Sequence, residues 1–225
     1  MENLQQYDEG LSKFYAAIYK WMAIGVAFSG VIAWLFLQSG HASLIFNNPV
    51  LFYGLIGIQL ALLFGVQWFM NKLSHTASFV LYFAYAGVTG VLSSYIFAVY
   101  DLGNILGVFA ASVLMFGALA LYGYTTKKDL SGWGVFLFAA MWGVFAVSII
   151  NAFLQSEITH FVVSIIAIIV FAGLTVYENQ HYKNIYYQVK DNEELKDKMV
   201  TQGALHMYIN FIMIFRNLLY LVNRN

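Results

Sequence analysis

An acidic side chain, Glu178, directly follows the apolar stretch His160–Tyr177. A carboxyl group at the edge of hydrocarbon is costly, so such groups usually mark a functional site. The apolar stretch Gln202–Val222 carries a row spaced three or four residues apart: Gln202, His206, Asn210, Met213 and Asn217. This spacing places them on one face of a helix. A mostly polar face on an apolar helix should turn away from lipid, toward a partner such as Glu178.

Two interpretations of this row remain open. Its side chains can join helices by hydrogen bonds inside the membrane, or they can conduct or sense ions. At 1.5 Å per residue, His206 and Asn210 lie about 6–12 Å into their helix. If the two helices are neighbours, these groups share a cytoplasm-facing pocket with Glu178. Glu178 or His206 would then titrate near neutral pH, since histidine has an ordinary pKa of about 6.5.

The composition indicates that lipid surrounds the elements that carry these residues. Hydrophobic residues make up 61% of the chain and charged residues 10%, whereas soluble domains contain about 45–50% and about 25%. The mean hydropathy is +0.70. A soluble fold of this size has too little interior to hide that much apolar surface. We therefore expect an all-α integral membrane protein with one transmembrane domain over residues 1–225.

Charge and cysteine content narrow the function classes. The formal net charge is zero, which argues against a nucleic-acid partner, because such a partner needs a basic stripe. There are no cysteines, which excludes disulfides, thiolate metal sites and cysteine nucleophiles.

The apolar stretches are continuous rather than alternating, which predicts helices and not a β-barrel. A helix needs about 20 residues to cross about 30 Å of hydrocarbon. On this basis seven spans are predicted: Trp21–Gln38, Val50–Met70, Ser78–Val99, Gly103–Tyr124, Gly132–Leu154, His160–Tyr177 and Gln202–Val222. The longest connector, His181–Val200, carries eight charged residues and is expected to be a solvated helix or loop.

The basic residues predict the orientation. Nine lysines fall on one side of the predicted spans and only Arg224 on the other, with Arg216 inside the last span. By the positive-inside rule, the N-terminus is cytoplasmic and the C-terminus lies outside. Arg216 either snorkels outward or pairs within the bundle.

Motifs typical of enzymes are missing. The sequence has no Walker loop, Rossmann fingerprint, HExxH or GxSxG motif. Intramembrane hydrolysis would need a paired acid, a metal triad or an activated serine, and none is apparent. The last span lacks a lysine for a retinal Schiff base. We therefore expect neither an enzyme nor a cofactor.

Three segments, together with the seven-span layout, carry a family resemblance: Tyr124–Leu130, Tyr177–Gln180 and Gly203–Ile212. The chain resembles the Bax inhibitor-1 family, also called the transmembrane Bax inhibitor motif family, over essentially its whole length. The resemblance implies a seven-helix bundle with the seventh helix at its centre. Bacterial members behave as pH-sensitive calcium leak channels, and eukaryotic members modulate calcium stores and restrain cell death.

The resemblance also implies functional positions, at which this chain departs from the family pattern. Members often carry aspartates at the positions of Glu178 and Asn210, and this pair is thought to share protons. Here Glu178 keeps the charge, while Asn210 cannot ionise. Members commonly carry a glutamate in the second helix, and this chain has Gln59 at that position. Members also carry a basic residue at the cytoplasmic end of that helix, which is thought to act as a latch, and the basic candidate here is Lys72.

These departures have physical consequences. Two close carboxylates titrate as a coupled pair, and that coupling is lost when Asn210 is neutral. Calcium favours six to eight oxygen ligands, so Glu178 with amides offers no stable metal site, only a weak, transient cation contact. Weak binding is compatible with conduction, because a permeant ion must also leave. Any pH dependence is therefore expected to come from Glu178 with His206.

Two functions follow. The first is a membrane ion-leak channel or calcium-homeostasis regulator in a bacterial plasma (inner) membrane, with calcium as permeant ion. Its pore or pH-sensing candidates are Glu178, Asn210, His206, Asn217, Gln59 and Lys72. The alternative is a non-conducting membrane interaction protein that modulates a membrane protease or quality-control complex. The loss of the second carboxylate and of the second-helix glutamate favours this alternative.

Overall fold

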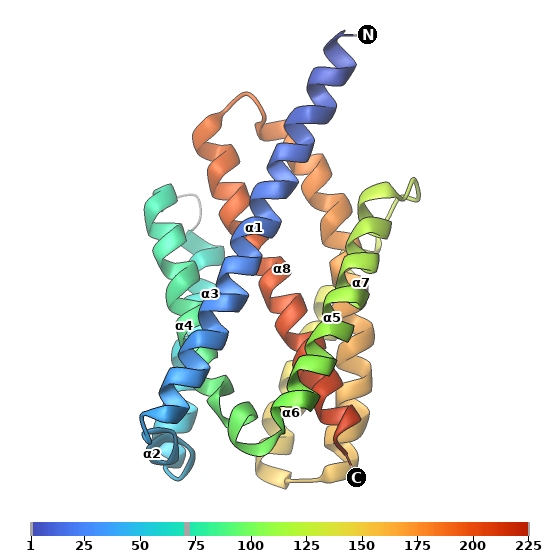
Figure 1. Ribbon diagram of the computed structural model, residues 1–225. Coiled ribbons are helices and arrows are strands. Elements are labelled where there is room, and N and C mark those ends of the chain that lie inside the picture. The colour runs from blue at the N-terminus through green and yellow to red at the C-terminus, as the bar shows by residue number, and fades with distance from the viewer. Residues whose placement is uncertain (1, 70–72, 225) are drawn as a thin grey trace. The chain divides into compact units, whose positions relative to one another are not determined.

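The computed structural model describes residues 2–69 and 73–224, with the side chains of residues 9–65 and 73–224. The described chain is all-helical, as expected (Figure 1). Its helices are α1 (Glu2–Gln38), α2 (Ala42–Phe46), α3 (Pro49–Phe69), α4 (His75–Val99), α5 (Leu102–Thr125), α6 (Trp133–Leu154), α7 (Glu157–Val189) and α8 (Glu193–Val222). The single proline of the chain, Pro49, opens α3, where a missing backbone N–H costs no helical hydrogen bond.

Within the described residues, six helices are long and apolar enough to cross a membrane: α1 from Glu9, α4, α5, α6, α7 and α8. The chain is therefore an integral membrane protein. The predicted second span, Val50–Met70, corresponds to α3, whose described apolar part, Pro49–Gly65, is shorter than these six. The helical membrane fold is confirmed, whereas the count of seven spans and the central place of the last one stay predictions.

Three helices, α1, α7 and α8, run beyond the predicted spans. α1 begins at Glu2, and α7 continues to Val189, so only residues 190–192 separate α7 from α8. Most of the predicted solvated connector is thus helix. Buried aromatic residues explain the extension, since Phe14 and Tyr186 are 3% and 6% exposed and their rings lie 5.4 Å apart.

The chain forms two compact units. Unit 1 comprises Met1–Leu102 and Tyr186–Tyr208, and therefore holds α1 to α4, the end of α7 and the first half of α8. Unit 2 comprises Gly103–Ile185 and Ile209–Asn225, and holds α5, α6, most of α7 and the second half of α8.

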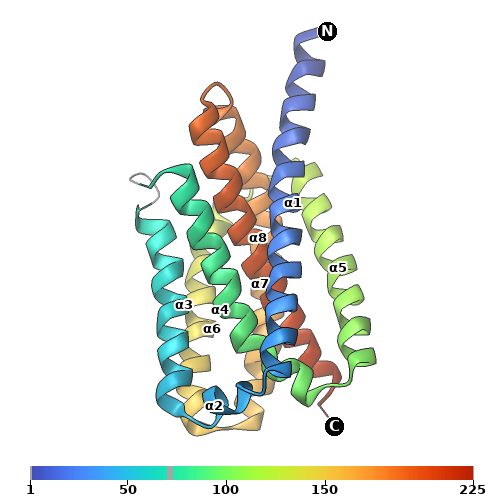
Figure 2. The same ribbon diagram turned by 60° about the vertical axis from the view of Figure 1, so that its left-hand side comes forward.

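In unit 1, α1 packs along α4 (Figures 1 and 2). The Tyr82 hydroxyl donates a hydrogen bond to the Trp21 carbonyl oxygen at 2.9 Å. It reaches that carbonyl across Gly25, where a Cβ atom would collide with the Tyr82 hydroxyl. Small residues thus let two helices approach closely, as is common in membranes.

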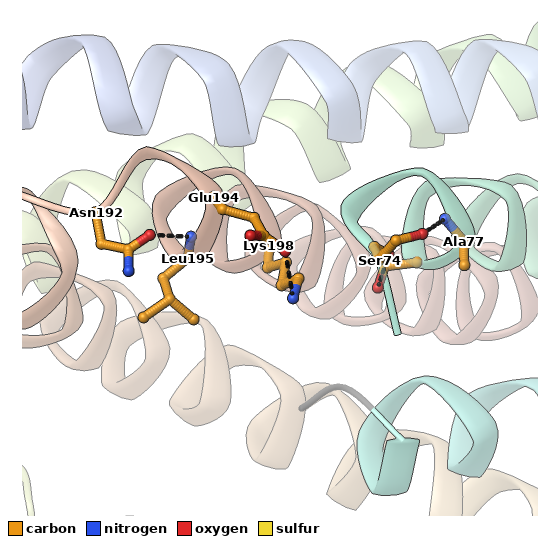
Figure 3. A network of polar contacts seen from close by, with 7 residues as sticks. Ser74, Ala77, Asn192, Glu194, Leu195 and Lys198 are labelled. Atoms are coloured by element: carbon orange, nitrogen blue, oxygen red, sulfur yellow. Dashed lines mark hydrogen bonds and ion pairs between the residues drawn. The ribbon is translucent and has the colours of Figure 1, made fainter. Parts of the chain in front are cut away.

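The N-terminal ends of α4 and α8 are fixed by side-chain caps, which Figure 3 shows. Ser74 Oγ accepts a hydrogen bond from the Ala77 backbone N–H at 3.2 Å. Asn192 Oδ1 accepts one from the Leu195 backbone N–H at 3.1 Å. Each cap satisfies a backbone donor that has no partner within its helix.

In unit 2, aromatic rings join α5 to the second half of α8. Phe109 of α5 meets Phe211 and Phe215 of α8 edge-on, at ring-centroid distances of 5.5 and 5.8 Å. α7 in turn packs on α6, where a Cβ atom at Gly173 would lie 2.8 Å from Leu137. These contacts fix the helices that carry Glu178 and Asn210.

The contact between α1 and α4 yields a stability prediction. A Cβ atom at Gly90 would lie 2.6 Å from the Ser29 carbonyl oxygen, whereas one at Gly87 meets only side-chain atoms at 3.6 Å or more. Overpacking of this kind costs about 1–3 kcal/mol. Gly90→Ala should therefore lower the unfolding temperature in detergent, by roughly 2–4 °C per kcal/mol. Gly87→Ala, on the same helix, should leave it unchanged or raise it; equal effects of the two variants would contradict the packing described.

Candidate functional site

A buried hydrogen bond joins α7 to α8 inside unit 2. The Asn210 amide nitrogen, Nδ2, donates to Glu178 Oε2 at 2.7 Å. The two residues are only 2% and 3% exposed. The structure thus brings together a carboxyl group and an amide that are 32 positions apart in the sequence. The bond compensates part of the cost of removing both groups from water.

The surroundings of Glu178 on α7 are buried as well. Thr175, one turn earlier, is fully buried, and its hydroxyl donates to the Phe171 carbonyl oxygen at 2.8 Å. Tyr182, one turn later, is 1% exposed and interacts electrostatically with Glu178. Because these residues share a face of the helix, Glu178 sits within a continuous buried stripe of α7.

The remaining predicted site residues lie elsewhere. Asn217 Nδ2 donates at 2.7 Å to the Met213 carbonyl of its own helix. Gln59 lies in unit 1, where its Nε2 donates to Thr89 Oγ1 at 2.8 Å and ties α3 to α4. His206 is half-buried and also belongs to unit 1. A pocket shared by His206 and Glu178 therefore stays a prediction, and Lys72 lies outside the described residues.

No structural role for Gln180 was indicated by the sequence. In the structure, both the nitrogen and the oxygen of its side-chain amide form hydrogen bonds. Its Nε2 donates to the Lys128 carbonyl at 2.6 Å, and its Oε1 accepts from the Leu130 backbone N–H at 2.8 Å. The signal that could have found it is the polar run Glu178-Asn179-Gln180. On a helix, successive residues point about 100° apart, so three polar residues in a row need three different partners.

The buried pair can hold a proton or contact a cation. Among the residues that the structure describes, no group of three or more His, Asp or Glu side chains is placed to hold a metal ion. A carboxyl group supplies at most two of the six to eight oxygens that calcium favours. The pair alone therefore falls short of a complete calcium site.

The fold and the buried carboxyl–amide pair are those of an all-helical integral membrane protein. Comparison with known proteins identifies its family. A family model described as "Inhibitor of apoptosis-promoting Bax1" matches residues 11–225. The chain therefore belongs to the Bax inhibitor family, as its resemblance predicted.

Similar proteins extend over nearly the whole chain. "Inner membrane protein YbhL" of Escherichia coli K12 is 39% identical, over 97% of this chain and 94% of its own length. A protein of Borreliella burgdorferi is 32% identical, over 92% of this chain and 90% of its own length. A membrane protein of Streptococcus pyogenes serotype M3 is 32% identical, over 98% and 96%.

The link between α7 and α8 can be measured with a double-mutant cycle. Glu178→Ala and Asn210→Ala should be less destabilising together than the sum of the two single changes. The expected coupling is about 0.6–1.7 kcal/mol, the range found for hydrogen bonds between membrane helices. It is read from unfolding in mixed micelles. Asn217→Ala is the matched control, because its amide bonds its own helix. A coupling of Glu178 to Asn217 as large as that to Asn210 would contradict the pairing.

Proposed function

We propose that this protein is a pH-sensitive ion-leak channel or calcium-homeostasis regulator of the membrane. The observation that carries the proposal is the buried hydrogen bond between Glu178 and Asn210, which joins two membrane helices. Ionisable groups inside membrane helices are rare and commonly mark ion pathways and proton relays. Membership of the Bax inhibitor family supports the same function.

Protonation of Glu178 supplies the pH response. An ionised carboxylate accepts a charge-assisted hydrogen bond, which is roughly twice as strong as a neutral one. Gain or loss of a proton therefore changes the strength of the link between α7 and α8 without a change in packing. A link whose strength depends on pH can bias two arrangements of the helices, which is how a local electrostatic event operates a gate.

The proposal includes the seven-span arrangement, with α3 as the remaining span and α8 at the centre. The most apolar window of α8 is 50% buried, against 22–44% for the other five candidate spans. A helix surrounded by others exposes less of its surface to lipid, so this difference supports a central α8.

The proposed location is a bacterial inner membrane with the N-terminus in the cytoplasm. The name of the Escherichia coli relative and the lysine distribution support it.

Because the chain has no cysteine, a single introduced cysteine reports the side of the membrane on which it lies. Lys13→Cys should react with a membrane-impermeant maleimide only in permeabilised cells, and Arg224→Cys in intact cells. Protection of both would indicate six crossings, and the opposite pattern an inverted protein.

Proteoliposomes that contain a calcium dye test conduction. Wild-type protein should admit calcium, with a flux that changes about fivefold or more between pH 5 and 8, the lower end of typical coupling between two sites. Glu178→Gln keeps the size and a hydrogen-bond acceptor but removes the charge, so its flux should no longer depend on pH. His206→Asn should shift the pH midpoint if His206 contributes.

Gln188→Ala, which replaces an exposed glutamine of α7, is the control and should conduct like wild type. Flux no higher than that of empty vesicles at every pH would remove the channel proposal. Flux whose pH dependence survives Glu178→Gln would remove only the role of Glu178.

The same hydrogen bond also favours a second candidate, a non-conducting interaction protein. Asn210 gives Glu178 a neutral partner, and such a pair can simply join helices. The protein would then act by binding other membrane proteins, such as a protease or quality-control complex. Crosslinking in the native membrane followed by mass spectrometry distinguishes the two. A stable partner combined with absent flux would decide for this candidate.

A further inference from the structure

The run Glu178-Asn179-Gln180 forms a junction at which α7 meets three other segments of unit 2. Glu178 bonds Asn210 of α8. Asn179 is fully buried, and its Cβ atom would lie 2.9 Å from a Cβ at Gly123 of α5. Gln180 bonds the loop between α5 and α6. Each of the three residues thus faces a different neighbour.

The loop contact is bidentate. The Gln180 amide donates to the Lys128 carbonyl and accepts from the Leu130 N–H, so it pairs with the loop backbone as a neighbouring strand would. Two such bonds fix the direction of the side chain as well as its distance. The Gln180 side chain is only half-buried. The two bonds are therefore not needed merely to satisfy a buried polar group.

The loop has a turn of its own that does not involve Gln180. The Ser131 backbone N–H donates to Asp129 Oδ1 at 2.9 Å, a local turn that aspartate commonly forms. Hydrogen bonds from Ser131, backbone and side chain, hold the pKa of Asp129 below its ordinary value. Gln180 therefore binds a segment with a defined shape.

The two helices that flank the loop also touch α7. On the α5 side, Gly123 lies so close to the Val176 carbonyl that a Cβ atom would collide with it. On the α6 side, a Cβ atom at Gly134 would lie 2.5 Å from the Tyr177 ring. Gln180 and the two flanking helices thus hold the loop next to the segment of α7 that carries Glu178.

We propose that Gln180 is a positioning residue for Glu178. By binding the 126–132 loop, it fixes the rotation of α7 about its axis and keeps Glu178 directed at Asn210. The two side chains are two positions apart, and therefore point about 200° away from each other around the helix. Bonds on nearly opposite sides resist rotation of α7 in either direction. The inference rests on the proposed role of Glu178, although its test does not require conduction.

Full-length Gln180→Ala in proteoliposomes tests the proposal with two readouts. Loss of the acceptor should speed hydrogen exchange at the Leu130 amide about three- to tenfold, the change expected from one hydrogen bond. Dicyclohexylcarbodiimide, which modifies carboxyl groups within membranes, should label Glu178 severalfold faster and with a changed pH profile. Mass spectrometry measures both, with Glu178→Gln as the blank for labelling.

Two further variants separate positioning from general damage. Gln188→Ala replaces an exposed glutamine of the same helix and should change neither readout. Gln180→Glu keeps the acceptor for the Leu130 N–H but loses the donor to the Lys128 carbonyl. It should therefore give intermediate labelling, and it serves if Gln180→Ala fails to fold.

Unchanged exchange at Leu130 in Gln180→Ala would show that Gln180 does not hold the loop. Faster exchange with unchanged labelling of Glu178 would show that the loop is held without effect on Glu178. Either result overturns the proposal. Absence of calcium flux in wild type would remove the channel function alone, because exchange and labelling would still decide the role of Gln180.

Discussion

The fold of unit 2 depends on one constraint, which is that the carboxyl group of Glu178 is almost fully buried. Burying such a group without partners would cost several kcal/mol. Asn210 meets part of this requirement with a hydrogen bond at 2.7 Å. A bond of that length leaves α7 and α8 little freedom to slide or turn, so the chemistry of Glu178 and the register of the two helices are fixed together.

Close helix contacts make that register attainable. Gly123 and Gly134 leave room for the backbone of α7 and for the Tyr177 ring, and larger residues would push α5 and α6 away from the segment that holds Glu178. Lipid cannot supply the tight fit itself, because acyl chains are as apolar as the helix surfaces they touch. Small residues and a few hydrogen bonds therefore do in this membrane protein what hydrophobic burial does in a soluble one.

The sequence predicted the parts of this arrangement that follow from periodicity. Continuous apolar stretches located the helices, and the spacing of Asn210 and its neighbours indicated an inward polar face. The Gln180 contact could not be predicted in this way, because it pairs a side chain with loop backbone about fifty positions away. Every residue has the same backbone carbonyl, and nearly every one the same N–H, so residue types do not reveal which backbone groups a side chain will bind. The connector His181–Val200 was expected to be a solvated helix or loop, so the burial of Tyr186 in the helical extension of α7 was not predicted.

The amide of Asn210 determines what kind of response the pair can give. A second carboxylate would lose its attraction to Glu178 when both groups ionise, and the helices would be driven apart by charge repulsion. An amide N–H is a donor at every pH, so it can bond the carboxyl group whether or not Glu178 carries a proton. Protonation of Glu178 would therefore weaken the link between α7 and α8 but would never turn it into repulsion. A protein built on such a pair would respond to pH gradually. The contact of Gln180 with the 126–132 loop would then set how far α7 can move in that response.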